Sequence, residues 1–252
     1  MTSLSPSVAP DNFTWSRVWS VMRLIAPRVR NLTIVYVAIC IAVAVLVLLG
    51  RLVGFPIGSI GLFSVIPCIM FYVAPAFLLN ATDTLQFQLI PAKVSEKFVA
   101  IVIYSIVLNY LIVSISSIPV AVTVLDNEAT SSIQTIMKAK FGSSWVGLNQ
   151  LSGLLAPIVC MYVSIASPGR KWQAVGAAFL VCVVEGLVGG IYGIFMTTRC
   201  VGLFDGEPDV DLIVETILSG VAPFMLATMV VCVLLSVLFM VLAYRQLASR
   251  QI

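Results

Sequence analysis

Glu185 is the residue whose type and position most directly suggest chemistry. It lies near the middle of the apolar run Trp172–Met196 and is the only charged residue deep inside any long apolar run of the chain. An ionised carboxylate at the centre of a membrane span costs about 2.5–3.5 kcal/mol, so it should face a bundle interior, a polar partner or water. Two interpretations stay open: Glu185 belongs to a substrate path or proton relay, or it makes a structural hydrogen bond to a neighbouring helix.

Four glycines follow Glu185 in the same run. Gly186 and Gly190 are four residues apart, and so are Gly189 and Gly193. Small residues at this spacing let two helix backbones approach closely. The pattern favours helix packing, either within the chain or at an interface between subunits.

A second group of candidate residues lies in LIPAKVSEKF, residues 89–98, which places charges between two long apolar runs. Pro91 suits the first turn of a helix, where its missing N–H costs nothing. Lys93 and Lys97 are four residues apart and so share one side of that helix, with Glu96 on an adjacent strip. We expect the lysines and the glutamate to face lipid headgroups or a protein groove. The segment is a short helix parallel to the membrane, the helical start of the next span, or a solvated loop.

The remaining motifs predict neither catalysis nor a metal site. The acidic run DGEPDVD at 205–211 lacks the glycine and terminal glutamate positions of an EF-hand, so it favours a solvated loop over a calcium site. The chain has no histidine and no CxxC pair among its six cysteines, which removes the usual metal ligands. Since no nucleophile–base pair or nucleotide-binding loop occurs either, we expect no catalytic residue, no metal and no cofactor.

Composition indicates that membrane-spanning helices position these residues. Of the 252 residues, 60% are hydrophobic and 10% are charged, and the mean hydropathy is +1.10. Soluble domains carry about 25% charged residues, so the sequence predicts an all-α protein that crosses a membrane several times. Six apolar runs approach or exceed the roughly 20 residues that a transmembrane helix needs. These predicted spans are Leu32–Gly50, Ile57–Leu79, Phe98–Leu125, Trp145–Ala166, Trp172–Met196 and Ile217–Tyr244.

The residues before the first span predict an amphipathic helix at 13–31, after a polar tail at 1–12. Apolar residues recur there at helical spacing, and its tryptophans and arginines suit the membrane interface and anionic headgroups. Pro27 should kink this helix or end it. The alternative is a plain basic flank to the first span. The residues assigned to the interfacial helix are Trp15, Arg17, Trp19 and Arg23.

The distribution of Lys and Arg predicts the orientation in the membrane. With the N-terminus inside the cell, ten of the 14 basic residues fall in inside segments and four in outside segments. We therefore expect six spans with both termini inside (N-in/C-in). The basic residues fit this topology, and the net charge of +3 predicts no nucleic-acid partner.

Taken together, these features resemble the ABC-2-type permeases, which are membrane subunits of ABC exporters. The likeness covers the six runs, the amphipathic start and the short charged segment between the second and third runs. It also covers the apolar segment VDLIVETILSGVAPFML at the start of the sixth run, which Gly220 and Pro223 interrupt. In addition, LIPAKVSEKFVA resembles the LPAS…EKF segment of small ABC-2-like membrane proteins of Bacteroidetes-type bacteria, with Lys93 in place of the usual serine.

The resemblance implies a location, partners and a coupling site. The chain would be a permease subunit in the bacterial cytoplasmic (inner) membrane that forms a translocation path with a second permease subunit, as a homodimer or heterodimer. ATP hydrolysis would occur in a separate ABC ATPase subunit, so the chain itself is expected not to be an enzyme. Residues 82–98 would form a cytoplasmic coupling segment within a six-helix domain at 32–252. The residues that would face the ATPase or shape this segment are Pro91, Ala92, Lys93, Glu96 and Lys97.

Two other classes of function stay open. The first is a non-transporting integral membrane protein, such as an assembly or sensor subunit. The second is an intramembrane enzyme or an ion-coupled secondary transporter, for which Glu185 alone is thin support because no inverted repeat with broken helices is evident.

Overall fold

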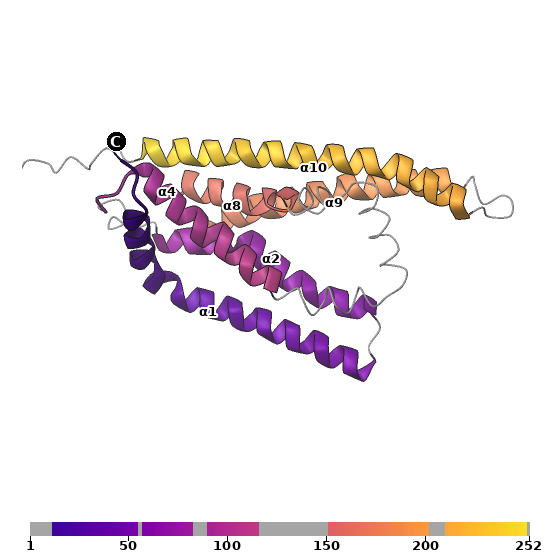
Figure 1. The fold of residues 1–252 in the computed structure, drawn as a ribbon, viewed down its shortest axis with the longest axis horizontal. Helices are drawn as coiled ribbons and strands as arrows, with labels where there is room; N and C mark the ends of the chain where they lie inside the picture. The colour runs from indigo at the N-terminus through magenta and orange to yellow at the C-terminus, as the bar shows by residue number, and fades with distance from the viewer. Residues whose placement is uncertain (1–11, 55–56, 83–89, 116–150, 202–209, 251–252) are drawn as a thin grey trace, which may run out of the picture.

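All of the regular structure that the computed structural model describes is helical (Figure 1). The described residues are 12–54, 57–82, 90–115, 151–201 and 210–250. Across them the prediction of an all-α protein is confirmed. The elements are α1 (Trp15–Val53), α2 (Ile57–Thr82), α4 (Val94–Val102), the π-helical turn η1 (Ile103–Val107), α8 (Leu155–Ala166), α9 (Lys171–Val201) and α10 (Val210–Ser249).

Within the described residues, four helical stretches are long and apolar enough to cross a membrane. They correspond to the first, third, fifth and sixth predicted spans, and their composition identifies a helical membrane protein. The described apolar stretches of α2 and α8 are shorter, at Ile66–Leu79 and Leu155–Ala166. Residues 1–11 of the polar tail, residues 83–89 of the coupling segment, parts of the predicted third and fourth spans, and residues 205–209 of the acidic run lie outside the described residues. The four long stretches are Val29–Gly50, Val94–Ile115, Lys171–Phe195 and Pro223–Ser249.

Helix α1 joins the amphipathic segment to the first span without a break. Pro27 lies inside this helix, and the ribbon changes direction between its short indigo start and its long second part (Figure 1). A bend is the expected effect of proline, because the ring removes a backbone donor and clashes with the preceding turn. Of the two predicted effects of Pro27, ending the helix is therefore wrong.

The aliphatic side of this amphipathic segment packs on protein. Val18, Ile25 and Val29 are buried in the largest hydrophobic cluster, with residues from α2, α4, α8 and α10. Trp15 and Trp19 are 66% and 56% exposed. The aliphatic residues of this segment therefore belong to the core, and the exposed tryptophans remain available to the membrane interface, which stays a prediction.

One end of each of α1, α2, α4, α8, α9 and α10 lies at the same end of the molecule, where the described chain also begins and ends (Figure 1). The guanidinium of Arg250, after α10, donates a hydrogen bond to the carbonyl of Ala166 at the end of α8, at 2.9 Å. An aromatic pair joins the start of α4 to the last turns of α10, and a lysine at the start of α9 lies over a ring near the end of α2. The largest core cluster lies here too. We name this the basic end for the residues that it carries: Arg17, Arg23, Lys93, Lys97, Arg170, Lys171, Arg245 and Arg250.

Helix α4 is the start of a span. It begins at Val94 with Lys93 as its N-cap, and helix continues through η1 to Ile115. Of the three predicted alternatives for LIPAKVSEKF, the helical start of the next span is therefore the correct one. Pro91 precedes this helix instead of lying in its first turn. That prediction is wrong because a bond from the Lys93 N–H to the Glu96 carboxylate fixes the helix start two residues later.

Candidate functional site

Glu96 is the centre of the contacts that join α1 to α4 at the basic end. Its side chain is fully buried, with 0% exposed. The carboxylate oxygen Oε1 accepts the backbone N–H of Thr14 at 3.0 Å and lies 3.5 Å from Nη1 of Arg17. The other oxygen, Oε2, accepts the backbone N–H of Lys93 at 3.0 Å. We name this set of four residues the Glu96 clamp.

The Glu96 clamp serves both local and long-range structure. Its bond to Lys93 is half of a capping box, in which a carboxylate three residues into a helix returns to the N–H of the N-cap residue. The hydrogen bond that Glu96 accepts from the Thr14 N–H and its ion pair with Arg17 fasten the start of α1 to the start of a span. A buried carboxylate is tolerated only when it is paired and hydrogen-bonded, and these partners meet that requirement.

The expectation that Glu96 and Lys97 face headgroups or a protein groove is wrong. Their exposed fractions are 0% and 2%. Spacing along one helix cannot reveal this, because Glu96 is covered by a segment 82 residues earlier in the chain. Among the residues assigned to coupling, Pro91 is exposed, and Ala92 and Lys93 are partly exposed. These three are the ones that a partner could reach.

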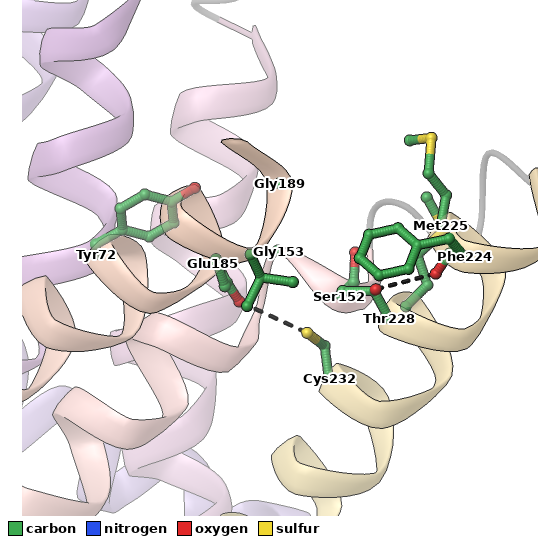
Figure 2. Close-up of a pocket in the computed structure, with 11 residues that line it drawn as sticks. Tyr72, Ser152, Gly153, Glu185, Gly189, Phe224, Met225, Thr228 and Cys232 are labelled. Atoms are coloured by element: carbon green, nitrogen blue, oxygen red, sulfur yellow. Dashed lines mark hydrogen bonds between the residues drawn. The ribbon is translucent and has the colours of Figure 1, made fainter. Parts of the chain in front are cut away.

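Glu185 lies midway along α9, about 21 Å from Lys171 at its start. It points toward α10, where the Cys232 thiol donates to its Oε1 at 3.7 Å (Figure 2). A thiol is a weak donor, so the structural hydrogen bond that the sequence left open is present but weak. Among the described residues, no basic side chain pairs with Glu185.

Two hollows meet at Glu185. The first, of about 440 Å³, is lined by polar side chains of three helical segments, Tyr72, Ser152 and Thr228, as well as by apolar ones (Figure 2). The second, of about 580 Å³, lies between α9 and α10 and is lined almost entirely by aliphatic and aromatic side chains. Each volume falls in the range of about 300–1,000 Å³ that is typical of small-molecule sites. The residues that line both hollows are Glu185, Val188, Phe224, Thr228 and Cys232.

The glycines after Glu185 lie on an open face of α9. All four are exposed, and a Cβ added to any of them would meet no described atom within 4 Å. Close packing on a neighbouring helix of the same chain therefore finds no support among the described residues. The alternative, an interface between subunits, stays a prediction for Gly186, Gly189, Gly190 and Gly193.

Two buried polar residues of the third span were not identified from the sequence. The Ser105 hydroxyl donates to the carbonyl of Ile101 at 2.7 Å, and the Asn109 amide donates to the carbonyls of Tyr104 and Ser105, each at 3.0 Å. These bonds lie around η1, where the helical register changes and carbonyls lose their usual partners. The sequence did contain a signal, because Ser105 and Asn109 interrupt the otherwise apolar segment IVIYSIVLNYL.

No family model, curated protein or solved structure matches this chain. The residues and their geometry are therefore the basis of the function proposed next.

Proposed function

We propose that this chain is the six-span, N-in/C-in permease subunit of an ABC exporter in the bacterial inner membrane. It forms the translocation path with a second permease subunit and couples to a separate ATPase subunit through the exposed part of residues 89–98. The alternative is a non-transporting assembly or sensor subunit.

The arrangement of the helix ends supports the orientation. The start of α1, the end of α2, the start of α4, the end of α8, the start of α9 and the end of α10 share the basic end. Successive helices then run in opposite directions, as they do in a chain that crosses a bilayer six times. Because Lys and Arg concentrate on the cytoplasmic side of membrane proteins, the basic end is assigned to the cytoplasm.

The Glu96 clamp is the observation that carries the proposal. A subunit driven by an external ATPase needs a cytoplasmic element that moves together with its spans. The clamp joins the first turn of α1 to the first turn of the third span through one buried carboxylate. Pro91 is exposed beside the clamp, so force applied at Pro91 would reach α1 and α4 together.

Affinity purification tests the proposal. The chain should be co-expressed with its genomic neighbours and purified in mild detergent, with an unrelated polytopic protein as the control for nonspecific recovery. We expect an ATPase subunit at about equal stoichiometry in the chain's eluate alone. Repeated recovery of the chain without an ATPase would reject the permease function in favour of the assembly or sensor alternative.

A further inference from the structure

We propose that the two hollows at Glu185 form one binding site for a cationic amphiphile, a molecule with a single ammonium head and a hydrocarbon chain. The role of this molecule as the exported substrate rests on the proposed transport function. The binding site itself rests on geometry and charge.

The ammonium head binds at Glu185. In the described part of the chain, the carboxylate has only the Cys232 thiol as a hydrogen-bond partner and no countercharge. An ionised carboxylate at mid-span is costly unless it is paired, and an ammonium supplies both the missing charge and strong donors. The hydroxyl of Thr228 beside it already donates to the carbonyl of Phe224 at 3.0 Å, so its oxygen is left to accept from the ligand.

The hydrocarbon chain occupies the apolar hollow between α9 and α10. This hollow continues from Glu185 along α9 to Ala177, with Val184, Val231 and Leu235 among its walls. Eight residues of α-helix separate Glu185 from Ala177, which is about 12 Å. An extended alkyl chain of roughly ten carbons has a similar length, because C–C bonds of about 1.5 Å advance a zigzag chain by about 1.3 Å each.

Charge selects this ligand class over the alternatives. An anionic amphiphile would bring a second negative charge to Glu185, and like charges repel strongly in a medium of low dielectric. A neutral amphiphile would leave the carboxylate without a countercharge. A small hydrophilic cation would leave the apolar hollow without an occupant of matching character.

Equilibrium binding of radiolabelled dodecylammonium, which carries three N–H donors, to the purified full chain in phosphatidylcholine nanodiscs tests the site. Empty nanodiscs give the signal from partition into lipid, which is subtracted. We expect saturable binding that Glu185→Gln weakens by roughly tenfold or more, because the charged pair is lost. Dodecanoate should not compete, and methylammonium, which has the same donors but no long chain, should compete far more weakly than the labelled probe.

Replacing either of two alanines with phenylalanine separates an effect on the apolar hollow from general effects on the protein. Ala177→Phe fills the apolar hollow and should also weaken binding. Ala42→Phe adds the same ring to an exposed position of α1 that does not line either hollow, and it should bind the probe like the parent. Unfolding midpoints of all variants show whether each one is folded.

These outcomes test the binding site at Glu185 independently of the proposed transport function. Equal binding by the parent and a folded Glu185→Gln overturns the site, and so does effective competition by dodecanoate. Displacement of the probe by phosphatidylethanolamine at bilayer concentrations would assign the hollow to resident lipid and overturn the ligand class. Neither ATP nor an ATPase is present, so saturable binding that depends on Glu185 upholds the site even if no ATPase is ever recovered. In that case the transport function alone fails.

Discussion

At the scale of the residue, Glu96 is the position where one side chain holds two distant segments together. Its two oxygens accept backbone N–H groups from Thr14 and Lys93, and Arg17 supplies the countercharge. Removing one member of a buried ion pair leaves the other uncompensated, which costs about 3–5 kcal/mol. The clamp should therefore dominate the stability of the basic end.

Replacing Glu96 tests this directly. Glu96→Ala should lower the thermal unfolding midpoint of the purified protein by roughly 6 °C or more. Arg23→Ala is the matched control, since Arg23 is exposed on the same segment and lies over the Trp19 ring. An exposed charge contributes about 1 kcal/mol or less, so the control should barely change the midpoint. Equal shifts in the two variants would show that the clamp is not a special source of stability.

At Lys93, a substitution should raise the unfolding midpoint instead of lowering it. A lysine side chain cannot accept the N–H bonds that an N-cap serine accepts, although Glu96 already supplies the other half of the capping box. Lys93→Ser should raise the unfolding midpoint by roughly 2–4 °C, as expected for about 1 kcal/mol of capping. Lys93→Ala, which removes the lysine without adding a cap, should not. A midpoint for Lys93→Ser at or below that of Lys93→Ala would contradict the capping geometry.

The sequence was sufficient to find the residues of interest but not their surroundings. Composition and local spacing singled out Glu185, Glu96 and Lys97. The environments of Glu96 and Lys97 depend on contacts between segments far apart in the chain, and those are invisible to local spacing. The two hollows at Glu185 likewise need α9 and α10 to be placed side by side. Long-range packing therefore decided which charges are accessible to a partner.

At the scale of the element, α9 carries the least buried of the four long apolar stretches in the described residues, with 11% of that stretch buried. Exposed apolar side chains such as Leu180, Leu187 and Ile191 run along it, which suits contact with lipid. The length of its apolar run predicted this helix well, because in a membrane such a run satisfies its backbone internally only as a helix. Boundaries were less predictable where a single bond decides them, as at the start of α4.

The open glycines of α9 make a prediction about this helix. Gly186→Ala and Gly190→Ala each add a Cβ that meets no described atom within 4 Å. Glycine in a helix interior is less stable than alanine by about 0.5–1 kcal/mol. We therefore expect the double variant, purified as a single chain, to unfold at a higher temperature than the parent. A lower midpoint would mean that a neighbour packs closely on these positions.

At the scale of the whole molecule, the proposed six-span topology would make the basic end cytoplasmic and the opposite end external. Single cysteines in a cysteine-free background can report this, because a membrane-impermeant maleimide labels only the side it reaches. In intact cells, Leu52→Cys at the far end of α1 should be labelled, while Pro168→Cys and Arg245→Cys at the basic end should require permeabilised cells. Labelling of either basic-end cysteine in intact cells would contradict the N-in/C-in arrangement.

The central claim is that an ATPase docks at the basic end next to the Glu96 clamp. The most direct measurement is recovery of the ATPase encoded by a neighbouring gene with paired charge variants of the chain. Pro91→Asp adds a charge at the exposed residue beside the clamp, where a charge within a docked interface can cost several kcal/mol. Leu52→Asp adds the same charge at an exposed position of the opposite end. The account predicts full recovery with the parent and Leu52→Asp and strongly reduced recovery with Pro91→Asp. Recovery with Pro91→Asp equal to that of the parent, or no recovery with any of the three, would contradict it.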